Sequence, residues 1–299
     1  RRDPVSKQWV IIAAERGRRP LDFVPVVRES APKFCPFCPG HEEKSPAPIR
    51  VLTASGQGAA GAPWLVRVVP NKYPVLKVEG AIEAKGRGIY DRLNGIGAHE
   101  VIVETPLHSQ SLDELDLDHL TLLLGVYRER VEDLLRDTRF RYVTVFKNYG
   151  AGAGASVAHP HSQVIATPVT PITVSSTLRS TRDYFHQKER CLFCDLLSQE
   201  TEDGSRLVVQ NERYVAFCPY ASRVPFEVHI LPVAHQHDFI SHLQCFIHIM
   251  RDKQDGLVQP GLDTLEFILQ LVARDRVQRT DGLVHQNDCR ISGQRPRPT

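Results

Sequence analysis

The feature that most constrains the fold of this chain is an internal repeat. Cys35-Pro-Phe-Cys38 recurs as Cys191-Leu-Phe-Cys194 in the second half of the sequence. An apolar segment from Glu100 to His108 is matched by another from Glu227 to His235. Both halves share one order, in which a cysteine pair precedes short strands and an apolar strand that ends just before a histidine. This order predicts an α+β protein with two modules of similar design.

Turn-forming residues separate the two modules. Residues 167–182 begin with Thr-Pro-Val-Thr-Pro, which is typical of a connection between domains. We therefore expect an N-terminal module at residues 1–166, a linker at 167–182 and a C-terminal module at 183–299. After His108 in the first module, Ser111-Leu-Asp-Glu114 resembles a capping box, and apolar residues follow it at helical spacing. We expect a helix there that packs on the core and does no chemistry.

The composition is that of an ordinary globular protein. Hydrophobic residues make up 41% of the 299 residues, charged residues make up 24%, and the net charge is +2. This balance argues against a dedicated nucleic-acid surface, although the Arg16-Gly-Arg18-Arg19 cluster can meet phosphate groups locally. No apolar run approaches the roughly 20 residues of a membrane span, and the first residues lack the apolar core of a signal peptide. We therefore expect a cytoplasmic protein that binds neither nucleic acid nor membrane.

The first cysteine pair predicts a zinc site. A tetrahedral zinc takes four soft or borderline ligands, and one C-x-x-C turn can supply two of them. Cys35 and Cys38 are that pair, and His108 and His159 are the best completing ligands. Two thiolates balance the charge of the dication, which suits a site that braces the fold. A redox dithiol and a pair of half-buried thiols are the alternatives, but neither explains why the pattern recurs in the second half.

The second cysteine pair predicts a zinc site that is incomplete. Cys191, Cys194 and His235 correspond to three ligands of the first site. The repeat places the fourth ligand near residue 286, where His285 stands, but nothing around His285 resembles the surroundings of His159.

The richest chemistry lies in His159-Pro160-His161-Ser162-Gln163. In an extended segment alternate side chains share a face, so the two imidazoles and the amide point the same way. We expect His161 to be a nucleophile that attacks phosphorus, since a neutral imidazole is available at pH 7. Gln163 can donate its amide NH2 to a phosphate oxygen as charge develops there. The glycine-rich run before this motif, with Gly152, Gly154 and Ser156, can cradle the same phosphate.

The whole pattern resembles the galactose-1-phosphate uridylyltransferase family of the histidine-triad superfamily. The resemblance covers residues 1–240. The shared elements are Arg2-Asp3-Pro4, Trp9-Val10-Ile11, Arg16-x-x-Arg19-Pro20, the FCPFC segment, Asn71, His108, Phe146-Lys-Asn148, HPHSQ, Pro225-Phe226-Glu227 and Leu231-Pro-x-x-His235. Several details look closer to the plant-type ADP-glucose phosphorylase branch, namely Pro20-Leu-Asp22-Phe23, Gly97-Ala-His99-Glu100 and residues 174–184.

The resemblance implies a fold and an activity. Each module would be a histidine-triad-like antiparallel sheet with a crossover helix. His161 would become covalently nucleotidylated in a ping-pong reaction and Gln163 would stabilise the adduct. The nucleotide sugar, UDP-glucose or ADP-glucose, would pass its nucleotidyl group to hexose 1-phosphate or phosphate. Zinc would be the metal, and the protein would be a homodimer. The residues implied to contact nucleotide or phosphate are Arg16, Arg19, Asn71, Asn148 and Ser156.

The resemblance stops at about Ser241, and the last 60 or so residues do not match. A polar tail ends the chain, so we expect the second module to be incomplete, with an open sheet edge. Three classes of function remain. The first is a nucleotidyltransferase, and the second is a nucleotide hydrolase of the histidine-triad type. The third is an inactive, zinc-braced remnant. The amide of Gln163 cannot act as an acid, which favours transfer over hydrolysis.

Overall fold

The computed structural model forms two compact units. The large-sheet unit comprises residues 34–170 with 248–250, and the small-sheet unit comprises residues 1–13 with 171–234. Within these bounds the structure describes residues 1–13, 34–54, 56–58, 63–150, 153–224, 226–234 and 248–250.

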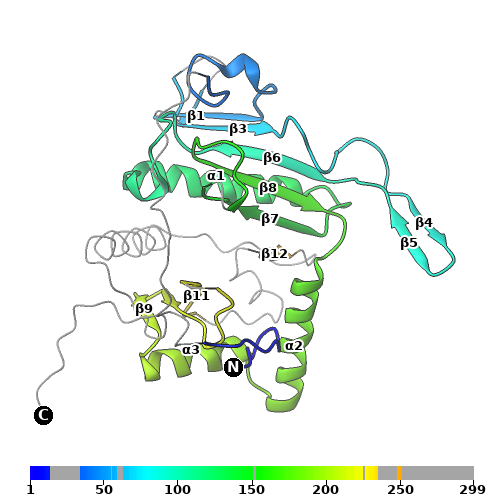
Figure 1. Cartoon of the computed structure of the whole chain (residues 1–299), viewed down its shortest axis with the longest axis vertical. Helices are drawn as coiled ribbons and strands as arrows, with labels where there is room; N and C mark the ends of the chain where they lie inside the picture. The colour runs from blue at the N-terminus through cyan, green and yellow to red at the C-terminus, as the bar shows by residue number, and fades with distance from the viewer. Residues whose placement is uncertain are drawn as a thin grey trace, which may run out of the picture. The chain divides into compact units, whose positions relative to one another are not determined.

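The large-sheet unit is built on an antiparallel seven-stranded sheet in the order β12-β7-β8-β6-β3-β1-β2 (Figure 1). Most of its strands are rich in β-branched residues, which favour the extended conformation. Their bounds are β1 (Arg50–Thr53), β2 (Gly56–Gln57), β3 (Val66–Pro70), β6 (Ala98–Val103), β7 (Tyr142–Phe146), β8 (His161–Thr167) and β12 (His248–Met250). The expected α+β class with antiparallel sheets is therefore confirmed.

The expected helix is α1 (Leu117–Leu135), which lies across one face of the sheet (Figure 1). The capping box at Ser111 is present, but it closes the short 3-10 helix η3 (Leu112–Glu114) and not α1. The chain returns to an extended conformation at Leu115, and α1 starts two residues later, after Asp116, whose side chain caps the helix by accepting a hydrogen bond from the His119 N–H. The sequence pattern therefore found a real cap but placed the start of the long helix several residues too early.

The register of β6 and β8 sorts the motif residues between the two faces of the sheet. Val103 lies opposite His161, and Val101 lies opposite Gln163. Side chains directly opposite one another share a face, so these four residues point to the same side. Ser162 points to the other side, where its hydroxyl meets Tyr127 of α1. The face away from α1 therefore carries the candidate chemistry.

A long excursion leaves the sheet between β3 and β6. It ends in the hairpin of β4 (Ala84–Arg87) and β5 (Tyr90–Leu93), which projects away from the sheet (Figure 1). Every residue of both strands is exposed. On its way back the chain passes Gly97, where a Cβ atom would lie only 2.4 Å from the Ala166 carbonyl oxygen. That close approach lets β6 start directly beside β8.

The small-sheet unit combines two helices with a three-stranded antiparallel sheet in the order β11-β10-β9. Its elements are α2 (Ile172–Lys188), α3 (Leu192–Asp203), β9 (Leu207–Gln210), β10 (Tyr214–Phe217) and β11 (His229–Pro232). The apolar core contains Leu192 and Phe193 of α3, Phe217 of β10 and Leu231 of β11. No helix among the described residues has both the length and the apolar character needed to cross a membrane.

Two features of the small-sheet unit differ from the expected module boundaries. Val5 belongs to the core of this unit, although the sequence pattern assigned residues 1–166 to the first module. Most of the range expected to be a linker is helical, since α2 spans Ile172–Lys188 and buries Val174, Ser180 and Thr181.

Candidate active site and metal centre

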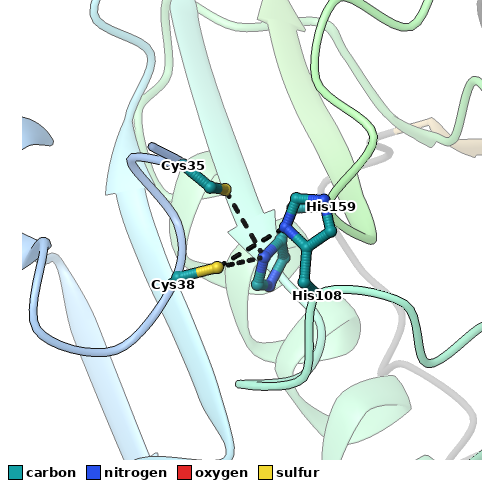
Figure 2. A group of neighbouring side chains, drawn as sticks. All are labelled: Cys35, Cys38, His108 and His159. Carbon is teal, nitrogen blue, oxygen red and sulfur yellow. Dashed lines mark hydrogen bonds between the residues drawn. The ribbon is translucent and has the colours of Figure 1, made fainter. Parts of the chain in front are cut away.

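Four cysteine and histidine side chains converge at one edge of the large-sheet unit. The cluster consists of Cys35, Cys38, His108 and His159, and their ligand atoms all lie within 4.8 Å of one another (Figure 2). Cys35 and Cys38 come from one turn, His108 follows β6, and His159 lies two residues before β8. Segments far apart in the sequence therefore meet at these four side chains, as the zinc prediction required.

The distances in the cluster fit a tetrahedral zinc. The Nδ1 atom of His159 lies 3.7 Å from Cys35 Sγ and 3.6 Å from Cys38 Sγ, and His108 Nδ1 lies 3.5 Å from Cys38 Sγ. Sulfur and nitrogen ligands at roughly 2.3 and 2.0 Å from one tetrahedral ion would be about 3.5 Å apart. The donor set and its spacing therefore match a closed structural zinc site.

A second contact orients His159 for metal binding. Its Nε2 atom lies 2.8 Å from the carbonyl oxygen of Thr105, so Nε2 carries the hydrogen and donates it. The neutral ring then has its lone pair on Nδ1, which faces both sulfur atoms. Histidine ligands of zinc commonly donate their other N–H in this way. The Nε2 atom of His108, in contrast, is buried without a hydrogen-bond partner.

Burial shifts the titration of two members of the cluster. Desolvation lowers the pKa of His159 to about 4, so its imidazole is neutral near pH 7 and can act as a ligand. Desolvation, helped by a hydrogen bond and the charge of Cys35, raises the pKa of the Cys38 thiol to about 11. A bound dication reverses that preference, because it stabilises thiolates directly. The buried cluster therefore suits a divalent cation, whose charge would stabilise the thiolate forms that burial alone disfavours.

Polar contacts attach the Cys35–Cys38 turn to the sheet. The turn continues into the 3-10 helix η2 (Glu42–Lys44). Glu42 accepts a hydrogen bond of 3.0 Å from the Trp64 indole N–H, and Arg67 of β3 reaches Ser45 Oγ at 2.5 Å. Arg67 is 2% exposed, so its burial holds the turn against a fixed part of the fold.

His161 begins β8 beside the metal cluster, and its ring orientation suits a nucleophile. Its side chain is buried, and its Nδ1 atom lies 2.8 Å from the carbonyl oxygen of His159. A carbonyl oxygen only accepts, so Nδ1 carries the hydrogen and the neutral ring has its lone pair on Nε2. The rings of His159 and His161 both contact Phe37, with centroids 6.1 and 5.5 Å away. The metal cluster therefore fixes the segment that aims the lone pair of His161.

Gln163 shares the face of His161 and contacts a histidine from the neighbouring strand. Its Oε1 atom lies 2.8 Å from the Nε2 atom of His99, which belongs to β6. The side chain of Asn71 meets the same imidazole, with Nδ2 at 3.0 Å from His99 Nε2. The sequence resemblance includes His99 in the Gly97-Ala-His99-Glu100 segment but implies no role for it. Its two-residue spacing from Val101 on β6 would have placed it on the chemical face.

The glycine-rich segment curls back on itself before the motif. The backbone N–H groups of Ala153 and Ala155 both donate to the carbonyl oxygen of Gly150, at 3.1 and 3.2 Å. Gly150 and Gly154 have positive φ values of 80° and 86°, which glycine adopts without strain. A Cβ atom at Gly154 would lie 4.0 Å from Asn148 Nδ2, so the loop stays close to Asn148. Ser156 is exposed.

A buried polar cluster supports the other face of the motif strand. Glu104 has no exposed surface and accepts hydrogen bonds from Ser162 and from Lys147. Tyr127 of α1 contacts both Glu104, at 3.1 Å, and Ser162, at 2.6 Å. Lys147 precedes Asn148 in the sequence, and Ser162 lies between His161 and Gln163. The cluster therefore fixes the two segments that carry candidate nucleotide contacts.

Four expected site residues fall in segments that the structure does not describe. Arg16, Arg19, Gly152 and His235 lie outside the described residues. Cys191 is the residue that caps α3 at its N-terminus, and Cys194 lies in the first turn of that helix. Across the part of the chain that the structure describes, the cluster of Cys35 is the only metal-ligand group with three or more members. The second zinc site therefore stays a prediction.

The fold and the site together define a histidine-triad-like nucleotidyltransferase. The sequence profile of the galactose-1-phosphate uridyl transferase N-terminal domain matches residues 65–171. The ADP-glucose phosphorylase of Arabidopsis thaliana is 35% identical over 245 residues, which cover 80% of this chain and 67% of that protein. The galactose-1-phosphate uridylyltransferase of Thermotoga maritima is 29% identical over 236 residues, covering 79% and 66% of the two chains.

Solved structures agree with these relatives. The crystal structure of an ADP-glucose phosphorylase from Arabidopsis thaliana with bound ADP-glucose matches with a TM-score of 0.68 and 28% identity, covering 94% of this chain and 78% of that one. A uridylyltransferase structure matches with a TM-score of 0.60 and 26% identity, covering 90% and 72%. The chain belongs to the galactose-1-phosphate uridylyltransferase family. It spans about two thirds of the length of the curated relatives that it matches.

Proposed function

We propose that this protein transfers a nucleotidyl group from a nucleotide sugar to a phosphate-bearing acceptor through a covalent adduct on His161. The observation that carries the proposal is the contact between His161 Nδ1 and the carbonyl oxygen of His159, at 2.8 Å. This contact places the lone pair of the neutral ring on Nε2, and the neighbouring His159 belongs to the cluster that suits zinc. A histidine held in this way is fixed both in tautomer and in direction.

The reaction would proceed as two displacements. In the first, the His161 Nε2 lone pair attacks the α-phosphorus of the nucleotide sugar, a P–N bond forms, and the P–O bond to the sugar phosphate breaks. In the second, an oxygen of the acceptor attacks the same phosphorus, a new P–O bond forms, and the P–N bond breaks. Gln163 would donate its NH2 to a non-bridging oxygen during both steps, because negative charge builds there.

Zinc would have a structural part in this scheme. Cys35, Cys38, His108 and His159 would hold it. A four-ligand site of this kind contributes folding free energy. The chain's own residues do the chemistry, and the ion fixes the segment from which His161 projects.

The similarity to the plant enzyme supports an adenine nucleotide as the donor. Identity is 35% with the ADP-glucose phosphorylase of Arabidopsis thaliana and 29% with the uridylyltransferase of Thermotoga maritima. We therefore favour ADP-glucose as the donor and phosphate as the acceptor, with UDP-glucose and a hexose 1-phosphate as the second pair. Reduced thiols in the metal cluster fit a reaction in the cytoplasm.

Covalent labelling tests the proposal. The full-length protein, loaded with zinc, is incubated separately with ADP-glucose and UDP-glucose, each labelled on the α-phosphate. We expect acid-labile label on His161, and more from the adenine nucleotide. His161→Gly should abolish the label and leave the zinc content near that of the wild type.

The remaining outcomes discriminate between the alternatives. Label from UDP-glucose alone would select the uridylyl donor. Label that is lost to water at the same rate with and without acceptor would support a hydrolase. A folded, zinc-loaded protein that takes label from neither nucleotide would be an inactive remnant and would contradict the proposal.

A further inference from the structure

His99 lies between two residues that the proposed reaction uses, Asn71 after β3 and Gln163 on β8. It lies on β6, and the β6–β8 register places it opposite Ile165, one step along the same face from the Val101–Gln163 pair. The backbone N–H of Asn71 donates to the His99 carbonyl oxygen at 2.8 Å, so the chain that follows β3 is tied to the same residue. The imidazole therefore sits between Asn71 and Gln163.

Contacts of the imidazole determine which nitrogen carries the hydrogen. The backbone N–H of Val75 points at His99 Nδ1 at 3.3 Å. A backbone amide cannot be turned round as a side-chain amide can, so Nδ1 must accept and must carry the lone pair. The hydrogen of the neutral ring is then on Nε2.

The position of this hydrogen fixes the amide of Gln163. The Nε2 atom of His99 lies 2.8 Å from Gln163 Oε1 and 3.0 Å from Asn71 Nδ2. Asn71 Oδ1 already accepts from the Tyr73 backbone N–H at 2.9 Å, so its NH2 end faces the ring, and with Nε2 protonated that contact is donor to donor and not a hydrogen bond. An NH2 group cannot accept a hydrogen bond, so the acceptor that the Nε2–H meets is Gln163 Oε1.

From these contacts we infer that His99 is a positioning residue for nucleotidyl transfer, because it sets which end of the Gln163 amide faces the reacting phosphate. An amide has two nearly isosteric ends of opposite hydrogen-bonding character. With Oε1 held by His99, the NH2 end is presented to the oxygens of the phosphate. Turned the other way, the amide would direct a partial negative charge at a negatively charged group. His99 thus acts through Gln163 and need not contact the substrate.

This inference rests on the proposed function, since it assigns Gln163 the stabilisation of the nucleotidyl-histidine. It also identifies what the Gly97-Ala-His99 segment contributes. The backbone at Gly97 lies so close to β8 that a Cβ atom added there would be 2.4 Å from the Ala166 carbonyl oxygen. The start of β6 is therefore held tightly against β8, and the His99 ring can reach a side chain two residues back along that strand.

A double-mutant cycle on single-turnover labelling tests the inference. We compare the wild type, His99→Phe, Gln163→Ala and the double variant, measuring the rate of label transfer to His161 from ADP-glucose and from UDP-glucose. Losing one hydrogen bond of ordinary net strength should slow labelling by about 2- to 10-fold in His99→Phe. The double variant should be no slower than Gln163→Ala, because His99 has nothing to orient once the amide is gone.

The conservative variant and the binding constant separate positioning from a merely structural role. His99→Gln returns a donor N–H to the site and should recover at least half of the wild-type rate. The Kd of the nucleotide sugar should change less than the labelling rate in His99→Phe. Losses that add in the double variant, or a His99→Gln variant as slow as His99→Phe, would overturn the inference.

The ring tautomer gives a readout that does not depend on activity. In ¹⁵N-labelled, zinc-loaded wild type, the His99 signals should show a protonated Nε2 and an unprotonated Nδ1, and His99→Phe assigns them. A protonated Nδ1 in the neutral ring would overturn the inference. A wild type that takes no label from either nucleotide sugar would overturn the proposed function and this role with it. Labelled wild type with additive losses would overturn the role of His99 alone.

Discussion

Arg130 of α1 and Glu100 of β6 form a buried two-point ion pair. Arg130 Nε and Nη2 each donate to one carboxylate oxygen of Glu100, both at 2.8 Å. The two side chains are 7% and 6% exposed, and Asp133 adds a third contact to Arg130 at 2.9 Å. This pair ties the helix to the strand that also carries His99.

Removing one partner of this pair should be much worse than removing both. Glu100→Ala leaves the Arg130 guanidinium buried without its main partner, and we expect a loss of about 3–5 kcal/mol in the free energy of unfolding. The double variant Glu100→Leu, Arg130→Met replaces the pair with apolar side chains and should recover most of that loss. Urea unfolding of the wild type, Glu100→Leu, Arg130→Met and the double variant measures the coupling. A double variant as unstable as the sum of the two singles would contradict the expectation.

Zinc should stabilise the large-sheet unit. Cys35→Ala removes a ligand, so we expect the loss of one equivalent of zinc. At free zinc about a thousandfold above the Kd, the wild type gains roughly 4 kcal/mol over the metal-free protein. Elemental analysis and thermal unfolding with and without chelator measure both effects. His186→Ala changes an exposed histidine of α2 and serves as the control, since its zinc content and Tm should match the wild type. Unchanged zinc content in Cys35→Ala would rule out the assigned ligand set.

The sequence predicted those parts of the site that are local or that recur. The C-x-x-C spacing, the histidine at the end of an apolar strand and the HPHSQ motif each show in a short stretch of sequence. Their convergence could be anticipated because the same order appears twice in the chain. The long helix was predicted from the local spacing of its apolar residues. The family and the α+β class were predicted from short motifs and from their order along the chain.

Contacts between segments that share no pattern could not be predicted. A charged residue on an amphipathic helix is expected on the solvent face, but Arg130 is buried against Glu100. The packing of α1 on β6 brings the two residues together, and neither segment alone indicates how the helix lies on the strand. The same holds for His99, whose role depends on the pairing of β6 with β8. The cap at Ser111 was real, but the sequence did not reveal that the chain would straighten at Leu115 before the helix begins.

Stability should fall in acid partly because of Glu227. Burial alone would raise the pKa of this carboxyl, but hydrogen bonds and charge from Arg223 outweigh burial and lower the pKa below its ordinary value. Arg223 reaches Glu227 Oε1 through Nη2 at 2.7 Å and through Nε at 3.0 Å. A carboxyl with a lowered folded-state pKa stabilises the protein above its unfolded-state pKa of about 4.3. That stabilisation is lost as the pH falls through the folded-state value.

Glu227→Gln should therefore flatten the pH dependence of unfolding on the acid side. The variant should be less stable than the wild type at neutral pH, and the difference should shrink as the pH falls below about 4. Urea midpoints taken from pH 7 down to pH 3 give the comparison. Glu212→Gln, at an exposed position of the same unit, should run parallel to the wild type throughout. Equal acid slopes for the wild type and Glu227→Gln would show that the ion pair contributes nothing to the acid response.

Two glycine-to-alanine changes should have opposite signs. A Cβ atom at Gly97 would lie 2.4 Å from the Ala166 carbonyl oxygen and 2.6 Å from Leu76, and a backbone atom cannot move aside cheaply. We expect Gly97→Ala to destabilise the protein by about 1–3 kcal/mol through overpacking, and to slow His161 labelling because β6 carries His99. Gly125 lies inside α1 with nothing within 4 Å of its Cβ position. Gly125→Ala should stabilise the protein by up to about 1 kcal/mol, since alanine is the better helix former. Urea unfolding gives both signs, and a Gly97→Ala variant as stable as the wild type would mean that β6 and β8 are less tightly packed than their register requires.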